Sequence, residues 1–255
     1  MRIKKNNPII LFSCLLICSI LSGCITGRDL YDKQAAEALR TAQEALKTAQ
    51  HADDMNEINN VMSAHVWYHS ALLNDVDIEK NWSKRSDIVF AQNFGYYIGP
   101  ESIKSSYGKT YTRESTKGTY MWHPTTSSII VVAGDRKTAK GVWYTPSGII
   151  GSFQDEPVNF NWMFEKYGVD FVMEDGKWKI WHMHIYTDIA WAVGTKIRSS
   201  GGGVDFTDLS KTAVPDKLED NYKQLSPSTE MVLVPRPPEP YETWADTWSY
   251  VDPGE

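Results

Sequence analysis

The stretch FEKYGVDFVMEDGKWKIWHMHIYTDI, residues 164–189, determines the class of fold. It is rich in aromatic and β-branched side chains, which favour strands, and it predicts one long strand over 158–174 and another over 177–189. Asp175 and Gly176 lie between them, and this dipeptide is typical of a β-hairpin turn. We therefore expect an antiparallel sheet of long strands at the centre of the fold.

On the N-terminal side of this hairpin, the period of the apolar residues stays at two back to residue 87 and becomes helical before it. Gly99-Pro100 predicts the start of a short helix, because proline suits a first helical turn. Helices followed by a run of strands indicate an α+β fold with helices on one face of the sheet. The further strands are predicted over 87–91, 94–98, 119–123, 127–133 and 138–145.

Two helical patterns precede the strands. Residues 29–62 are rich in Ala, Gln, Glu and Lys without Gly or Pro, and their apolar stripe is mostly Ala. This pattern favours a stalk or a packing helix over a long coiled coil, because the stripe lasts few heptads. Residues 53–82 carry a stronger stripe, which contains Ile58, Met62, His65, His69 and Leu72.

The N-terminus has the pattern of an export signal. Three basic residues precede a short apolar run, and Leu21-Ser22-Gly23-Cys24 follows it. This motif resembles the bacterial lipobox, in which the chain is cut before a cysteine that receives lipid. We therefore predict a signal peptide over 1–23, lipidation of Cys24 and a location on a membrane of the bacterial cell envelope. An ordinary signal peptide with an incidental cysteine is the alternative.

Composition narrows the classes of function. The chain has 255 residues, of which 42% are hydrophobic, and a net charge of −6 from 26 basic and 32 acidic side chains. An acidic chain of this kind is not expected to bind nucleic acid. The three cysteines all lie within the first 24 residues, which excludes a disulfide framework or a cysteine-based zinc site in the folded body. The sequence contains no glycine-rich phosphate loop that follows a strand and opens a helix, and we predict no cofactor.

The C-terminal extension, residues 196–255, differs from the rest of the chain. It begins with a glycine-rich linker and continues with an acidic segment that contains PRPPEP at 235–240. Trp244 and Trp248 follow this proline-rich motif. Because a fully solvated tail rarely needs two tryptophans, we expect this extension to pack on the folded body or on a neighbouring subunit.

Three segments carry a family resemblance. EINNVMSAHVWYHSALLNDVDIEKNW at 57–82, MWHPTTSSIIVVAGDRKTAKGVWY at 121–144 and the hairpin at 164–189 together resemble a SnoaL-like domain of the nuclear transport factor 2-like superfamily. By motif they are most similar to the scytalone dehydratases and the bile acid 7α-dehydratases. The resemblance implies a domain over 53–195, preceded by a helical segment over 24–52.

The resemblance also implies a shape and an activity. The expected fold is a cone, formed by a curved antiparallel sheet and closed by N-terminal helices, with a pocket for a small apolar ligand. His123 stands where those dehydratases place a histidine before the third strand. Their Tyr and Asp at the end of the first long helix fall on His69 and Asn74, and a bile acid dehydratase Arg falls near Thr187. The histidine is therefore kept while its partners differ.

We predict an acid/base site, because an imidazole titrates near neutral pH. The candidate catalytic residues are His123, His69 and Asp188. The candidate substrate-binding residues are His65, Asn74, Tyr97, Tyr107, Tyr144, Tyr167, His182 and His184. His65 and His69 lie four residues apart and could chelate a metal, but no third ligand motif accompanies them, so no metal site is predicted. Satisfied core or loop histidines are the alternative.

The last predicted strand places His182, His184, Tyr186 and Asp188 in phase with Trp178 and Ile180. If the two apolar residues face the core, this polar row faces the ligand pocket. The opposite phase is also apolar, so the direction of the row is open from the sequence.

Two functions follow from these residues and from the resemblance. The first is a cofactor-independent lyase of the dehydratase type, or an isomerase, that acts on a small hydroxylated, largely apolar ring compound. The second is a non-catalytic ligand-binding or assembly lipoprotein that uses the same pocket. In both cases the predicted partners are a small apolar ligand, the membrane through the lipid on Cys24, and further copies of the chain in a dimer or trimer.

Overall fold

A computed structural model describes residues 8–110, 119–151, 159–192, 213–218, 230 and 232–252, with side chains from residue 28 onward. The chain divides into two units, residues 1–52 and 53–255. The side chains of the predicted signal peptide and of Cys24 lie outside the described residues, so lipidation stays a prediction. Within the described part of the chain, no helix is long and apolar enough to cross a membrane.

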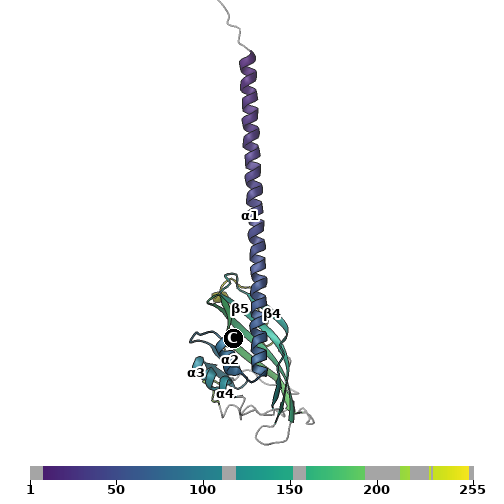
Figure 1. Ribbon diagram of the computed structural model, residues 1–255, viewed down its shortest axis with the longest axis vertical. Coiled ribbons are helices and arrows are strands. Elements are labelled where there is room, and N and C mark those ends of the chain that lie inside the picture. Colours follow the sequence, from purple (N-terminus) through teal and green to yellow (C-terminus); the bar gives the residue numbers. More distant parts are fainter. Residues whose placement is uncertain are drawn as a thin grey trace, which may run out of the picture. The chain divides into compact units, whose positions relative to one another are not determined.

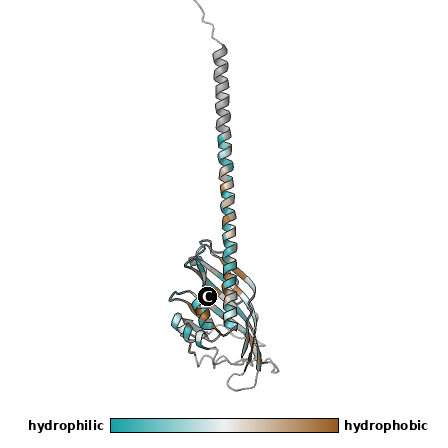
Figure 2. Ribbon diagram, viewed as in Figure 1, coloured by the Kyte–Doolittle hydropathy of each residue, from teal (hydrophilic) through white to brown (hydrophobic). Residues whose placement is uncertain are grey.

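The first helix is longer than the sequence predicts. Helix α1 (Pro8–Ser70) joins the two expected helical patterns into one element, and the short helix α2 (Asn74–Asn81) follows it. Leu72 separates the two helices with a φ of 60°, a left-handed conformation that ends a helix. Residues 28–49 of α1 are exposed and alternate between polar and apolar side chains (Figure 2).

Most strands lie within two residues of their predicted bounds, but the strand predicted over 138–145 continues to Gly151 and the one predicted over 177–189 continues to Ala192. The strands form one sheet (Figure 1). Their order is β2-β1-β7-β6-β5-β3, with β4 paired to β5. Two short helices, α3 (Pro100–Ser105) and α4 (Tyr107–Thr110), lie between β2 and β3, and Pro100 begins the first of them as expected. The strands are β1 (Val89–Gln92), β2 (Gly95–Ile98), β3 (Tyr120–Trp122), β4 (Thr126–Val132), β5 (Thr138–Gly151), β6 (Asn159–Glu174) and β7 (Lys177–Ala192). The fold is thus mixed α+β with a curved, unclosed sheet.

One strand pair differs from the expected antiparallel sheet. Strand β1 runs parallel to β7, with Val89 opposite His182 and Ala91 opposite His184. Tight hairpins fix the direction of neighbouring strands such as β6 and β7, but β1 and β7 are far apart in the sequence. No turn therefore fixes their relative direction.

The central hairpin forms as the sequence predicts. Glu174 pairs with Lys177, which leaves Asp175 and Gly176 as a two-residue loop. Both loop residues have positive φ, 51° and 73°, which matches the mirror-image turn that follows the twist of a hairpin. This turn sets the register of the two longest strands.

The hydrophobic core lies between the helices and one face of the sheet, which we call the inner face. Ile58 and Met62 of α1 pack in one cluster with Val169 and Phe171 of β6, and all four side chains are buried. The stripe predicted on the helix therefore faces the sheet. Figure 1 shows the last turns of α1 alongside the sheet.

Residues 232–252 cover part of the opposite, outer face of the sheet. The Trp244 ring lies 4.6 Å from the Trp181 ring, and the backbone N–H of Gly134 donates to the carbonyl of Tyr241. The ring of Tyr250 packs directly over Gly168, where a Cβ atom would lie only 2.6 Å from it. The expectation that the tail packs on the folded body is confirmed for these residues.

Candidate functional site

Three imidazoles gather on the inner face of the sheet. His65 and His69 lie on successive turns of α1, with ring centroids 5.7 Å apart, and His123 follows directly after β3. The ring of His69 lies 4.9 Å from that of His123 in an edge-to-face arrangement. All three side chains are buried. The helical phase of α1 thus brings its two histidines to the one that follows β3.

Asp77 of α2 anchors the first of these histidines. Nδ1 of His65 lies 2.8 Å from Oδ2 of Asp77, and the side chains of Tyr107, Trp82 and Asn81 also donate to this carboxylate. Burial alone would raise the pKa of Asp77, but the charge of His65 and these hydrogen bonds lower it below its usual value. The carboxylate is therefore ionised, and Nδ1 of His65 must be the donor.

His69 is held by an amide. Asn74 donates its Nδ2–H to the carbonyl of Tyr107, so its Oδ1 is left to accept from Nδ1 of His69, 2.9 Å away. Nε2 of a neutral His69 is then the unprotonated nitrogen. Burial, and next the charge of His65, lower the pKa of His69 to about 4. This imidazole is neutral at ordinary pH.

His123 faces Glu165 of β6. Nε2 of His123 lies 3.5 Å from Oε2 of Glu165, and the carboxyl also accepts from Thr187 at 2.8 Å and from Ser147 at 3.1 Å. Burial raises the pKa of Glu165 to about 7, even though these two hydroxyls oppose the shift. Burial and the charges of His69 and His65 hold the pKa of His123 well below its usual value. Both shifts disfavour charge, so below pH 7 the imidazole is neutral and most of the carboxyl is protonated.

Several buried polar atoms near these groups have no hydrogen-bond partner within the described part of the chain. They are Nε2 of His65, Nδ1 of His123, Oγ1 of Thr145 and the hydroxyl of Tyr167. The Tyr167 ring lies 5.9 Å from that of His65, and Thr145 is the strand partner of Glu165. An unmade buried hydrogen bond costs about 1–3 kcal/mol, so such atoms ordinarily meet water or a ligand. No group of three metal-binding side chains occurs in the described ranges.

The last strand does not bring its polar row to this site. β7 contains two irregularities, at Trp181 and at Asp188, where one extra residue interrupts the pairing with β6. The first shifts the alternation by one position, so Ile180 faces the core while His182 faces outward opposite Asp170. The expectation that His182 and His184 share the phase of Trp178 and Ile180 is therefore wrong.

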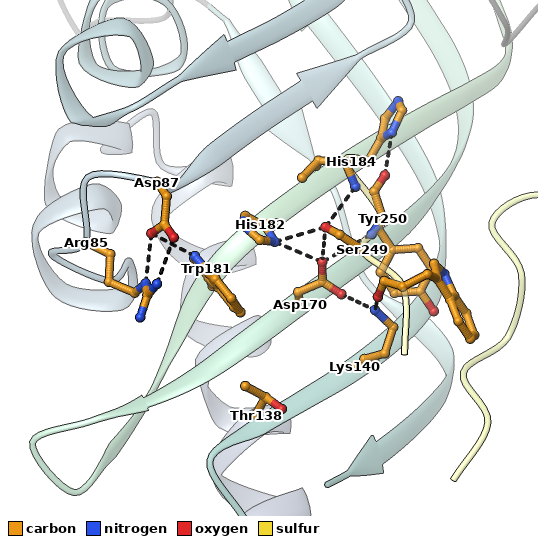
Figure 3. Close-up of polar contacts among 12 residues, drawn as sticks. Arg85, Asp87, Thr138, Lys140, Asp170, Trp181, His182, His184, Ser249 and Tyr250 are labelled. Atoms are coloured by element: carbon orange, nitrogen blue, oxygen red, sulfur yellow. Dashed lines mark hydrogen bonds and ion pairs between the residues drawn. The ribbon is translucent and has the colours of Figure 1, made fainter. Parts of the chain in front are cut away.

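On the outer face these histidines meet the tail. Nδ1 of His182 contacts Asp170 at 3.0 Å and Ser249 at 3.1 Å, and Nδ1 of His184 lies 3.0 Å from the carbonyl of Tyr250 (Figure 3). Lys140 pairs with Asp170 at 2.6 Å, and both side chains are fully buried. This cluster fastens the tail to the sheet.

Three other predicted residues lie apart from the imidazoles. Asp188 forms an ion pair with Lys166 at 3.1 Å. Tyr97 packs on Phe90 and donates its hydroxyl to a backbone carbonyl, and Tyr144 is 57% exposed. The structure therefore gathers six of the predicted site residues, namely His65, His69, Asn74, Tyr107, His123 and Tyr167.

Neither carboxylate of the site is predicted by the sequence. Asp77 lies in α2, which has 8 residues, too few for the sequence period to show which of its side chains face the core. Glu165 lies two residues before Tyr167 and four before Val169, so it occupies an inward position of β6. A charged residue in the inward phase of a long apolar strand is the signal that could have identified it.

The comparisons with known proteins agree with the resemblance found in the sequence. The family model of the SnoaL-like domain matches residues 50–184, more than half of the chain. No curated protein matches the chain.

Solved structures with similar backbones share little sequence with the chain. The function-unknown protein Rv3472 of Mycobacterium tuberculosis has 12% identity and a TM-score of 0.49, over 68% of this chain and 97% of its own. The hexachlorocyclohexane dehydrochlorinase LinA-type3 of Novosphingobium barchaimii has 12% identity and a TM-score of 0.45, over 59% and 95%. A candidate scytalone dehydratase of Novosphingobium aromaticivorans has 14% identity and a TM-score of 0.45, over 59% and 94%. The activities in these names belong to those proteins.

Proposed function

We propose that this chain, which belongs to the SnoaL-like domain family, is a cofactor-independent lyase or isomerase for a small hydroxylated, largely apolar ring compound. The observation that supports this most is the His123–Glu165 pair. It combines a neutral base with a protonated acid, 3.5 Å apart and buried. These are the two groups that an elimination of water requires.

The proposed reaction uses this pair, and solvent restores the two groups after each turnover. Nδ1 of His123 takes a proton from the carbon next to a carbonyl, and the C–H electrons form the double bond as the hydroxyl departs. Glu165 donates its proton to that hydroxyl, which leaves as water. After the product leaves, Nδ1 of His123 releases its proton to solvent and the Glu165 carboxylate takes a proton from solvent, which restores both groups in their starting forms. If the hydroxyl is retained and a proton is instead delivered to a different carbon of the enolate, the same base would give an isomerase.

The unpartnered atoms around the pair fit such a substrate. We assign the hydroxyls of Tyr167 and Thr145 to the substrate carbonyl, where two donors would stabilise the enolate that develops. The inner sheet face and α1 would close a cone around the apolar ring. Glu165 takes the role that the sequence leads us to expect of Asp188.

The test is a screen of cyclic β-hydroxyketones, beginning with 3-hydroxycyclohexanone, for formation of the conjugated enone by its ultraviolet absorbance. Turnover above the rate in buffer supports the lyase. If the compounds bind without any turnover or proton exchange, the ligand-binding function replaces it.

Asp77 should act as a positioning residue. Replacing Asp77 with Asn removes the charge that receives Nδ1–H of His65 and three further donors, and it should cost on the order of 2 kcal/mol of stability. Turnover should also fall. The measurement is urea unfolding together with turnover, and Asp75→Asn, which is exposed on the same helix, is the matched control. Equal behaviour of the two variants would contradict this role.

We also propose that Cys24 anchors the protein to a membrane of the cell envelope, where it forms a dimer or trimer. An acylated cysteine with more than one chain binds a bilayer far more firmly than a single chain does. Cys24→Ala should therefore move the protein from the membrane fraction to the soluble fraction. Cys18→Ala, within the predicted signal, should leave fractionation unchanged. Membrane association of the Cys24→Ala variant at the normal level would exclude the anchor.

A further inference from the structure

A cavity of about 550 Å³ lies on the outer face of the sheet, where two parts of the tail meet β7. Its volume is within the usual range for small-molecule sites. Tyr186 supplies the wall from the sheet, and Trp248 and Tyr250 supply aromatic walls from the tail. The side chain of Tyr186 points outward, opposite Lys166, so this cavity is separate from the imidazoles on the inner face.

The cavity contains a cation that is held in place by an aromatic ring. The guanidinium of Arg236 stacks on the Trp248 ring at 3.6 Å from its centroid. Within the described ranges, no carboxylate forms an ion pair with it. A guanidinium that is stacked by its face keeps its N–H edge available for a planar anion.

Arg85 is a second arginine of this protein that stacks on a tryptophan, and its guanidinium is paired with a carboxylate. It also stacks on a tryptophan, Trp181, at 4.6 Å, but it forms two hydrogen bonds with Asp87, at 2.7 Å and 2.8 Å (Figure 3). Arg236 shares the stacking arrangement, and among the described residues it lacks the carboxylate. The chain has a net charge of −6, so a guanidinium with no carboxylate partner among the described residues points to an anionic ligand in the adjoining cavity.

A second polar group points to a ligand in the same place. Oγ1 of Thr247, which also lines the cavity, is buried and has no hydrogen-bond partner among the residues that the structure describes. The remaining walls include Leu233 and Pro235, which are apolar. Asp252 contributes a carboxylate to the lining, which disfavours a ligand with more than one negative charge.

We infer that this cavity binds a planar aromatic monocarboxylate. Its carboxylate pairs with the edge of Arg236 and accepts from the hydroxyl of Thr247. Its ring lies in the cavity against Tyr186, Leu233 and Pro235. The ligand differs in charge and in location from the neutral ring compound assigned to the inner face, so the two sites stand or fall separately.

The test is a calorimetric titration of the full-length protein with 2-naphthoate, and with 2-naphthalenemethanol as the uncharged probe of similar shape. We expect saturable binding of the carboxylate and binding of the alcohol that is at least about tenfold weaker, because the charge-assisted bonds are missing. Arg236→Gln should weaken 2-naphthoate by at least about tenfold, and Thr247→Val by a smaller factor. Arg85→Gln is the matched control and should bind normally.

Three results would overturn the inference: no saturable binding of 2-naphthoate, equal binding of the alcohol, or unchanged affinity in Arg236→Gln. Thermal melting of each variant separates a lost site from a lost fold. A variant of the inner face locates the site, since His123→Ala should bind 2-naphthoate as the unchanged protein does. Loss of binding in that folded variant would place the ligand on the inner face and contradict the inference.

Discussion

His123→Ala should lower turnover of the dehydrated substrate by about two to four orders of magnitude, the usual contribution of a positioned acid or base. The residue provides an unpartnered Nδ1 and faces Glu165 with its other nitrogen. Its pKa is held well below the usual value by burial and by the neighbouring imidazoles, so the free base is the form present. The measurement is kcat in steady state at a pH below 7.

The control for this variant is Tyr120→Phe, an exposed change on the strand that precedes His123. It should keep full turnover, and both variants should melt near the temperature of the unchanged protein. Full turnover in a folded His123→Ala variant would contradict the proposed mechanism. His69→Ala, whose ring contacts that of His123, should give a smaller loss.

Asp170→Asn should have the largest effect on stability. Asp170 pairs with fully buried Lys140 and accepts from Ser249 at 2.7 Å and from the N–H of Tyr250 at 3.1 Å. Lys140 also lies 4.8 Å from the ring of Trp244. Removal of one partner from a buried ion pair leaves an uncompensated charge and typically costs about 3–5 kcal/mol. Urea unfolding measures this cost, and limited proteolysis should show that residues 232–252 become accessible.

The double variant Lys140→Met with Asp170→Leu tests whether an uncompensated buried charge causes the loss of stability in Asp170→Asn. An apolar pair of similar volume removes both charges and should recover much of the stability that Asp170→Asn loses. If the single variant unfolds like the unchanged protein, or if the tail stays equally resistant to protease, the cluster does not fasten the tail.

The sequence could predict the elements whose pattern is local. The hairpin at Asp175-Gly176, the strands and the inward stripe of α1 depend on turn chemistry and periodicity, and each forms, although the strand predicted over 138–145 continues to Gly151. The parallel pairing of β1 with β7 could not be predicted, because it depends on contacts between distant segments.

The candidate site was predictable only in part, because some of its geometry depends on how strands that are distant in the sequence pair. His65, His69 and His123 follow from helical phase and from the family resemblance, whereas one extra residue in β7 turns His182 and His184 to the other face. An extra residue reverses the direction of every later side chain, and no residue in the sequence marks Trp181 as that position. Glu165 could have been found from its strand phase, but its pairing with His123 depends on how the sheet curves.

The pH dependence of kcat/KM decides whether Glu165 acts as a protonated acid beside a neutral His123, on which the proposed reaction depends. Glu165 has a pKa of about 7 and the pKa of the base His123 is held well below its usual value, so kcat/KM should stay level just below pH 7 and fall as Glu165 loses its proton above about pH 7. In Glu165→Gln, the residual activity should lose the fall near pH 7. A rate that instead rises through pH 7, or a fall that persists unchanged in Glu165→Gln, would contradict this role of Glu165.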